Sequence, residues 1–257
     1  MENARYLECL AADFARLRSV VPLAPSAAVP TCPGWTVADL ARHVGTVYLH
    51  KTAAMREGAE PEPWPPKALA EEEALTLLDR AHAALLAEFA AHRPEDPAGS
   101  WYSPDPTVGF WIRRMAQETV IHRIDAELGT GQPVAPVPAD LAVDGIDELL
   151  KVFVAYSVAE WGDYFTDVLG DSPGRDYEVR TEGASWRLRS GPGLFTAEGG
   201  PGRIGGGAVD AVVSGPPAAV LRWVWNRQDG DPSPGVVVEG DPEAVTELRR
   251  CIVIATQ

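Results

Sequence analysis

The stretch PTCPGWTVADLARHVG, residues 30–45, joins a proline- and glycine-containing turn to the start of a helix. Thr36 stands three residues before Asp39, which is the spacing of an N-terminal capping box with aspartate in the usual place of glutamate or glutamine. The helix predicted to begin there carries His43 on an apolar face. That face is formed by Leu40, Val44 and Val47. His43 is therefore expected to point into the interior.

A second informative stretch is QETVIHRIDAE, residues 117–127, within a helix predicted over residues 108–128 and ending at Gly129. Five side chains recur there at steps of four, three, four and three, and so share one stripe of the helix: Trp111, Met115, Glu118, His122 and Asp125. Tryptophan and methionine indicate that this stripe faces inward. A buried glutamate is costly unless it is paired, protonated or bound to a metal.

Two inward histidines and one inward glutamate form a competent set of metal ligands. Catalytic zinc sites use three protein ligands and keep one position open, and the same donors also suit other divalent ions. Without a metal, Glu118 would hydrogen-bond to a histidine or pair with Arg114, four residues earlier. Two alternatives stay open for Asp125: a hydrogen bond that orients a ligand histidine, or a solvated acid that pairs with Arg123 or caps the helix.

The remainder of the chain changes from helical to mixed character. Further amphipathic patterns predict helices over residues 7–21, 71–90 and 138–160, with the PEPWPP loop at 61–66 between two of them. Four or five helices with short connections indicate a bundle. Strands are predicted for a hairpin around Glu182–Gly183 and for residues 208–213 and 235–240, with helices over 216–227 and from 241. The glycine-rich segment 191–207 is expected to be a flexible hairpin or loop.

These patterns predict the α+β class, with a helical bundle over residues 1–160 and a smaller α+β domain over 170–257. Hydrophobic residues make up 46% of the chain, enough for a substantial core. A formal net charge of −15 argues against binding to nucleic acid or to anionic membranes. The sequence has no apolar run of membrane-spanning length and no recognisable secretion signal, so a cytoplasmic location is expected. Three widely spaced cysteines predict free thiols. The oligomeric state is not predicted.

Residues 30–45 and 117–127 resemble, in order, the two motifs of the N-terminal domain of the mycothiol-dependent maleylpyruvate isomerase family. Residues 209–227 (VDAVVSGPPAAVLRWVWNR) and 236–245 (VVVEGDPEAV) are similar to the family's C-terminal domain. The resemblance implies a DinB-like four-helix bundle followed by a sterol-carrier-like α+β domain. It also implies that His43, Glu118 and His122 bind a divalent metal, with zinc expected, and that a C-terminal arginine assists catalysis. Arg227 is the best match, and Arg222 is the competing candidate.

The chemistry implied by the resemblance uses mycothiol as a thiol cosubstrate. A metal-bound thiolate attacks a small electrophile, and the enzyme acts as a cis–trans isomerase or as an S-transferase, with maleylpyruvate as one of several conceivable substrates. Two other functions remain open. The first is a non-catalytic small-molecule-binding protein with a metal-stabilised bundle. The second is a metal-dependent hydrolase, which would use the same ligands and need no thiol.

Overall fold

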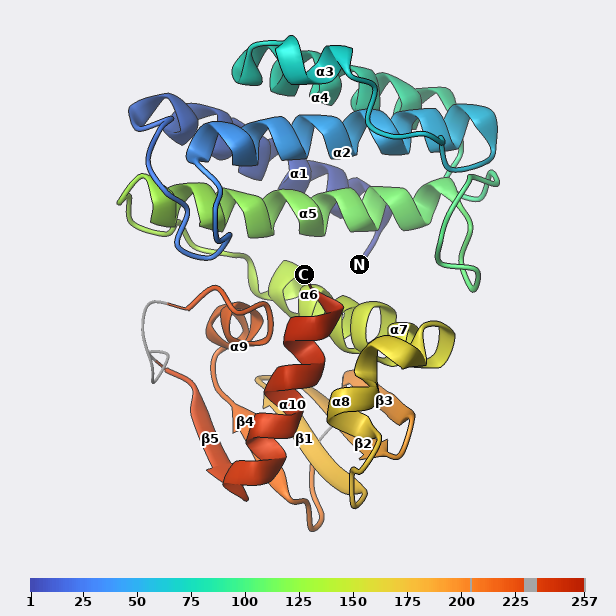
Figure 1. Cartoon of the computed structure of the whole chain (residues 1–257), viewed down its shortest axis with the longest axis vertical. Coiled ribbons are helices and arrows are strands. Elements are labelled where there is room, and N and C mark those ends of the chain that lie inside the picture. The colour runs from blue at the N-terminus through green and yellow to red at the C-terminus, as the bar shows by residue number, and fades with distance from the viewer. Residues whose placement is uncertain (204, 229–234, 257) are drawn as a thin grey trace. The chain divides into compact units, whose positions relative to one another are not determined.

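The computed structural model describes residues 1–203, 205–228 and 235–256, and the chain divides into two compact units, Met1–Ala135 and Pro136–Gln257 (Figure 1). The predicted boundary between residues 160 and 170 is therefore too late. The helical segment that follows residue 138 packs within the second unit, where its first part contacts the helix at 217–224 and its middle part contacts the strand at 194–201. Helical periodicity alone could not show which unit would cover its apolar face.

The first unit is a bundle of four long helices, as predicted. α2 packs against α4 and α5, and α1 packs against α5 (Figure 1). Two short helical turns, η1 and α3, belong to the connections. The helices of this unit are α1 (Asn3–Val20), η1 (Val21–Leu23), α2 (Val37–Glu57), α3 (Ala68–Glu71), α4 (Ala74–Ala91) and α5 (Val108–Gly129).

The start of α2 is fixed by the predicted capping box. The Thr36 hydroxyl oxygen accepts a hydrogen bond from the backbone N–H of Asp39 at 3.2 Å, and the Asp39 carboxylate accepts one from the backbone N–H of Thr36 at 2.9 Å. Further along α2, Gly45 allows a close approach to α4, since a Cβ atom there would lie 3.1 Å from Leu77 Cγ and 3.2 Å from the Leu78 backbone. These local features hold the helix that carries His43 in a defined position.

α5 packs against α1 and α2, and all its residues from Phe110 to Glu127 except Arg113 are buried. The predicted inward stripe is buried, but residues 119–121 and 123–124 between its members are buried as well. A helix enclosed on all sides has no solvated face. Each charged side chain of α5 must therefore find its partner inside the protein.

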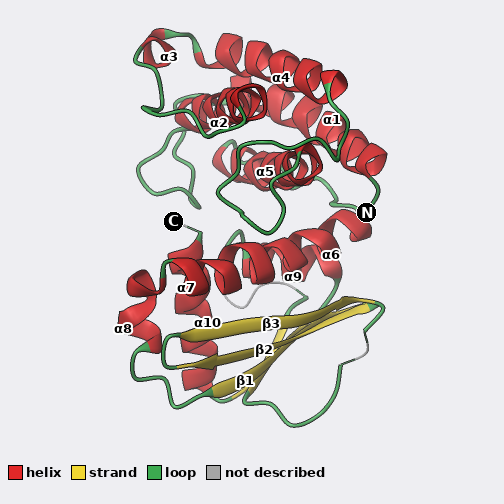
Figure 2. Ribbon diagram, turned by 90° about the vertical axis from the view of Figure 1, so that its right-hand side faces the viewer, coloured by secondary structure: helices red, strands yellow, loops and turns green. Residues whose placement is uncertain are grey.

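The second unit contains a mixed five-stranded sheet in the order β3-β2-β1-β4-β5, with helices against one face (Figure 2). β1 pairs in parallel with β4, and the other neighbours are antiparallel. The predicted hairpin is confirmed, with Val179 opposite Trp186. The strands are β1 (Arg175–Thr181), β2 (Ala184–Gly191), β3 (Leu194–Pro201), β4 (Ala211–Ser214) and β5 (Val237–Gly240).

Of the two forms expected for the glycine-rich segment, a flexible hairpin or a loop, the structure shows a hairpin, because residues 194–201 form strand β3 in a full antiparallel ladder to β2. One expectation for this unit is corrected. The helix expected over 138–160 is divided by a π-helical segment, η2. The helices are α6 (Ala139–Glu148), η2 (Leu149–Ala155), α7 (Tyr156–Glu160), η3 (Gly162–Phe165), α8 (Thr166–Leu169), α9 (Pro217–Val224) and α10 (Pro242–Ala255).

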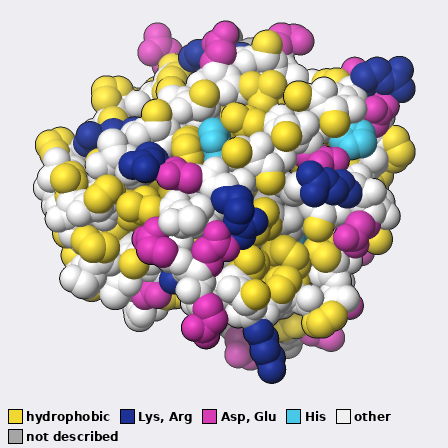
Figure 3. Space-filling model, turned by 90° about the horizontal axis from the view of Figure 1, so that it is seen from above, with side chains coloured by type: hydrophobic (Ala, Val, Ile, Leu, Met, Phe, Trp, Pro, Cys, Tyr) yellow, Lys and Arg dark blue, Asp and Glu magenta, His cyan; other side chains and the backbone are white. Residues whose placement is uncertain are grey.

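In the part of the chain that the structure describes, no helix is long and apolar enough to cross a membrane. Figure 3 looks onto the first unit from the side of α3, and basic and acidic side chains are interspersed on that face. The strong negative charge of the chain is therefore not visible there as a single acidic patch.

The end of α9 forms a Schellman motif that orients the segment before Arg227. The N–H of Arg227 donates to the carbonyl of Arg222 at 2.7 Å, and the N–H of Asn226 donates to the carbonyl of Trp223 at 3.1 Å. Asn226 has a φ of 57° and is the one non-glycine residue with positive φ among the described residues. Asparagine tolerates this left-handed conformation better than most side chains.

Substitutions of Asn226 should show how much the positive φ at this position contributes to stability. We expect Asn226→Gly to keep or slightly raise the free energy of unfolding, because glycine adopts positive φ without strain. Asn226→Ala should lower it by about 1 kcal/mol relative to the glycine variant. Urea unfolding followed by circular dichroism measures both. Equal stability of the two variants would show that residue 226 does not need the left-handed conformation in solution.

Candidate metal centre

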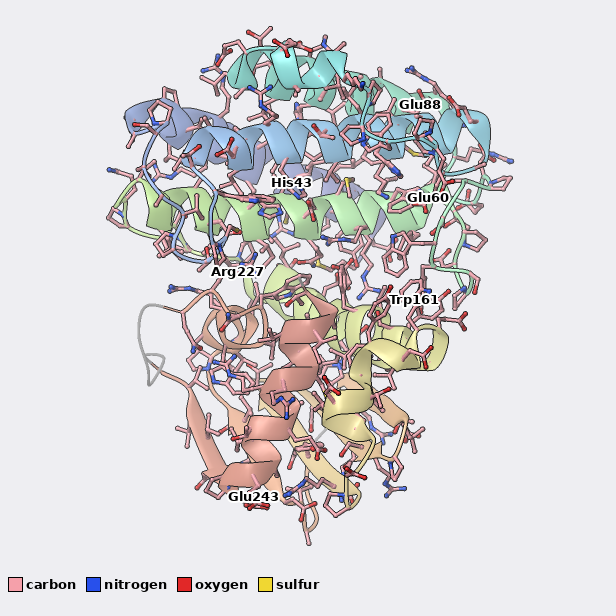
Figure 4. All side chains as sticks on the ribbon, in the orientation of Figure 1. His43, Glu60, Glu88, Trp161, Arg227 and Glu243 are labelled. Atoms are coloured by element: carbon pink, nitrogen blue, oxygen red, sulfur yellow. The ribbon has the colours of Figure 1, made fainter. Side chains whose placement is uncertain are left out.

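The structure brings together the three predicted metal ligands within the first unit. His43 comes from α2, and Glu118 and His122 come from successive turns of α5. Figure 4 shows His43 between the ribbons of α2 and α5. Nε2 of His43 lies 3.4 Å from Oε1 of Glu118, and Nε2 of His122 lies 3.2 Å from the same oxygen. One potential ligand atom from each residue lies within 4.8 Å of those of the other two.

These distances fit a divalent metal. With zinc–ligand bonds of about 2.0–2.2 Å, neighbouring nitrogen and oxygen ligands of a tetrahedral site lie roughly 3.3 Å apart. Both measured nitrogen–oxygen separations are close to this value. The donor set of two imidazoles and one carboxylate also matches catalytic zinc sites that keep a position open. The residues present therefore fit a bound metal without a large movement of either helix.

The carboxylate of Glu118 has different neighbours at its two oxygens. Oε1 faces the two histidines, and Oε2 accepts a hydrogen bond from the guanidinium of Arg114. Burial would raise the pKa of Glu118, but the charges of His122 and Arg114 outweigh it and hold this pKa well below its usual range. Both metal-free arrangements considered for Glu118 are thus present, one at each oxygen. A metal bound at Oε1 would leave the Arg114 pair in place.

His122 is held by its second ring nitrogen. Nδ1 lies 2.9 Å from Oδ2 of Asp125, which leaves Nε2 directed to Glu118. Burial lowers the pKa of His122, but Glu118 and Asp125 more than compensate and raise it to about 9. A ligand histidine has to be neutral at the nitrogen that binds the metal. Metal binding at Nε2 would therefore release a proton from this side chain at neutral pH.

Asp125 is fully buried, so the alternative of a solvated acid is wrong. Besides His122, its carboxylate accepts hydrogen bonds from the Thr31 hydroxyl at 2.5 Å and from the Cys32 thiol at 3.6 Å. Sequence reasoning missed Thr31 and Cys32, although both lie in the turn that precedes α2. Cys32, His122 and Asp125 form a second group of possible ligands. We assign Asp125 an orienting role because its oxygens are already committed to His122 and Thr31.

Removing the charge of Asp125 should weaken the metal centre without removing a ligand. We expect Asp125→Asn to lower metal affinity by roughly 10–100-fold, the range for loss of an outer-shell partner. Competition with a chromophoric chelator measures the affinity. Asp79→Asn, which removes an exposed carboxylate on α4, is the matched control. Unchanged affinity in Asp125→Asn would contradict the orienting role.

The side of the centre formed by His43 is accessible. The His43 side chain is 36% exposed, whereas those of Glu118 and His122 are 11% and 10% exposed. The Trp35 ring lies 4.7 Å from the His43 ring, centroid to centroid. A cavity of about 470 Å³ lies along α2 and includes His43 in its lining. A small molecule can therefore approach the centre from this side.

Arg227 belongs to the second unit and follows α9 directly. It is 9% exposed, and its Nη1 donates a hydrogen bond to the backbone carbonyl of Trp225 at 2.7 Å. Nε of Arg222, the competing candidate, donates to the backbone carbonyl of Arg227 at 2.8 Å. The two arginines are therefore parts of one local structure, and a substitution at Arg222 can disturb Arg227.

Comparison with known proteins finds a matching family for each of the two units. The sequence profile of the mycothiol maleylpyruvate isomerase N-terminal domain matches residues 7–127, and that of the MDMPI C-terminal domain matches residues 140–247. A crystal structure of the mycothiol-dependent maleylpyruvate isomerase is similar, with a TM-score of 0.62 and 16% sequence identity over 95% of this chain and 96% of that chain. A variant of that isomerase with one histidine replaced by alanine gives the same values.

At this level of identity, the structural similarity establishes the fold. A UbiJ-SCP2 ubiquinone synthesis protein also matches 47% of this chain, but its TM-score of 0.27 is too low to support an argument. A search of curated protein sequences returned no match.

Proposed function

Because the chain belongs to the mycothiol-dependent maleylpyruvate isomerase family, we propose that it is a metal- and mycothiol-dependent enzyme acting on a small electrophile. The proposed metal ligands are His43, Glu118 and His122, and zinc is the metal expected there. The observation that carries the proposal is the spacing of 3.2 and 3.4 Å between Glu118 Oε1 and the two histidine nitrogens. An accessible His43 beside a cavity adds a route for the reactants.

Some residues of the site are proposed to bind the metal, and others to orient these ligands. A divalent metal bound there supplies Lewis-acid chemistry that lowers the pKa of a thiol, which for a free thiol is about 8.5. Glu118 presents Oε1 to this position while Arg114 holds Oε2. Asp125 holds Nδ1 of His122 and so keeps Nε2 directed at the same position. The buried surroundings of Glu118 and His122 exclude bulk water from that side.

The reaction proposed for this site begins with addition of the thiolate to an electrophilic carbon. In an isomerase, the adduct of a cis double bond rotates and then releases the thiol, which gives the trans isomer and no net consumption of thiol. In an S-transferase, the adduct itself is the product. Arg227 is proposed to assist, because a guanidinium binds a carboxylate through two parallel hydrogen bonds. Arg222 is the competing candidate.

The test combines metal analysis with turnover. Purified protein is expected to contain about one equivalent of divalent metal by elemental analysis, the occupancy of a single three-ligand site. It should convert maleylpyruvate only when mycothiol is supplied, and a chelator should abolish the activity. Constant thiol with a trans product indicates an isomerase, and thiol consumed in equal amount to substrate indicates a transferase.

Three results would contradict the proposal in different ways. Turnover without thiol would favour a metal-dependent hydrolase. Bound metal without turnover of any electrophile tried would favour a non-catalytic binding protein. If the protein neither contains metal nor takes it up, the proposed metal-dependent catalysis is ruled out.

A further inference from the structure

The entry turn, residues 28–36, leads into α2 and contacts Asp125 of the metal centre. In Figure 1 the loop before α2 runs beside α5. The Thr31 hydroxyl donates a hydrogen bond to Oδ1 of Asp125 at 2.5 Å. The Cys32 thiol donates to Oδ2 at 3.6 Å, and Nδ1 of His122 lies 2.9 Å from the same oxygen. The entry turn therefore supplies a donor to each oxygen of this carboxylate.

The two shorter contacts fix the plane of the Asp125 carboxylate. A carboxylate held at one oxygen still rotates about the bond to its β-carbon, whereas partners at both oxygens define its plane. Thr31 holds Oδ1, and His122 lies against Oδ2. Asp125 is fully buried, so bulk water does not replace a lost hydroxyl. Loss of the Thr31 donor would therefore remove compensation from a buried acceptor and loosen its orientation toward His122.

The backbone of the entry turn is held by its own hydrogen bonds. The N–H of Val29 donates to the carbonyl of Trp35 at 2.9 Å. An antiparallel bridge between Ala28 and Thr36 closes the turn at its base. A substitution that changes only the side chain of Thr31 leaves these bonds in place. The position of the Thr31 hydroxyl is thus defined by the backbone of the turn.

The entry turn also connects the two helices that carry the proposed ligands. It continues directly into α2, which starts at Val37 and carries His43. At the end of α5, a Cβ atom on Gly129 would lie 2.9 Å from Cγ2 of Val37 and 3.3 Å from Cγ2 of Val29. The turn and the start of α2 therefore pack closely against α5 at Gly129, in addition to the hydrogen bonds to Asp125.

We propose that Thr31 is a positioning residue of the metal centre. Its hydroxyl orients the carboxylate of Asp125, and Asp125 in turn directs Nε2 of His122 toward the metal position. Thr31 touches neither the metal nor the reactants and acts through Asp125. The inference rests on the proposed function, because it requires His122 to bind a metal. The entry turn thereby couples the orientation of a ligand on α5 to the segment that starts the helix of His43.

A double-mutant cycle on the full chain tests whether Thr31 acts through Asp125. Zinc affinity of the metal-free protein is measured by competition with a chromophoric chelator. Thr31→Val removes the hydroxyl at nearly constant volume and should lower the affinity roughly tenfold, the lower end of the range for loss of an outer-shell partner. In the Asp125→Asn background the same substitution should lower it only about threefold, because a neutral oxygen accepts a hydrogen bond about half as strong as a carboxylate oxygen.

Two further variants separate the hydroxyl from the rest of the side chain. Thr31→Ser keeps the hydroxyl and should bind zinc as tightly as wild type. Thr76→Val is the matched control, because Thr76 is an exposed threonine of α4 whose hydroxyl donates to Glu73 at 2.9 Å. It should also keep the wild-type affinity. The visible absorption bands of the cobalt-loaded protein report the ligand geometry, and of these three variants Thr31→Val alone should change them.

The outcomes distinguish this proposal from the proposed function. Wild-type zinc affinity in Thr31→Val would overturn the positioning role and leave the metal-dependent function intact. An equal loss of affinity in the wild-type and Asp125→Asn backgrounds would also overturn it, because Thr31 would then act on the turn and not through Asp125. If Thr31→Ser binds zinc as weakly as Thr31→Val, the hydroxyl is not the responsible group. Failure of the wild-type protein to take up zinc would overturn both proposals.

Discussion

His43→Ala is expected to abolish stoichiometric metal binding and to reduce thiol-dependent turnover by more than the roughly 100-fold that follows loss of an outer-shell partner. His43 is the ligand whose removal is the cleanest, because it is the most exposed of the three and lies on a different helix from the other two. Its loss leaves the Glu118 pairs with Arg114 and His122 intact. The folded bundle should therefore survive, and the effect should be confined to the site.

Elemental analysis and turnover with mycothiol measure the two consequences of this substitution. His92→Ala is the matched control, since His92 is a half-buried histidine whose Nε2 lies 2.9 Å from the Glu88 carboxylate at the end of α4. We expect the control to keep its metal and its activity. Metal content and turnover equal to wild type in His43→Ala would show that the three residues do not form the catalytic centre.

Arg123→Met is expected to produce the largest loss of stability among the substitutions considered. Arg123 is fully buried on α5, and its guanidinium donates to Asp13 at 3.0 Å, to Glu127 at 2.7 Å and to the backbone carbonyl of Ala135 at 2.8 Å. Removing one partner of a buried ion pair costs about 3–5 kcal/mol, because the remaining charge has lost its compensation. Arg16, which also pairs with Glu127, should keep the loss near the lower limit.

Thermal unfolding compares the melting temperature of Arg123→Met with that of a control variant, Arg18→Met. A loss of about 3 kcal/mol corresponds to a fall of roughly 10 °C in the melting temperature of a domain of this size. Arg18→Met is the control, because Arg18 lies on the surface of α1 and forms an exposed pair with Asp79 at 3.0 Å. Such a pair contributes about 0.2–1 kcal/mol. If the two variants unfold at the same temperature, the buried network does not stabilise the bundle as described.

The features that were predictable from the sequence depend on neighbours within a few residues. The capping box needs only Thr36 and Asp39, and the placement of Glu118 and His122 on one face needs only the period of a helix. The placement of His43 toward α5 followed from the apolar residues around it, although its side chain remains 36% exposed. The resemblance to a known family connected these two helices, and the structure confirms that the three side chains meet.

The features that sequence reasoning missed depend on contacts between distant segments. Asp125 could have paired with Arg123, but Arg123 turns instead to Asp13, which lies 110 positions away on another helix. Besides His122, the partners of Asp125 come from a turn more than 90 positions earlier. The choice between a hairpin and a loop for the segment of β3 stayed open for a similar reason, since its glycines have no strand preference of their own and the ladder to β2 decides their conformation.

The arrangement of the three ligands on two helices has a consequence for heat resistance. A metal bound to His43 on α2 and to Glu118 and His122 on α5 would cross-link segments that are far apart along the chain. Because the three ligands meet only in the folded bundle, metal binding shifts the folding equilibrium by mass action, by about 2.7 kcal/mol at a free metal concentration 100 times the dissociation constant. Removal of the ion would then lower the resistance of the helical bundle to heat.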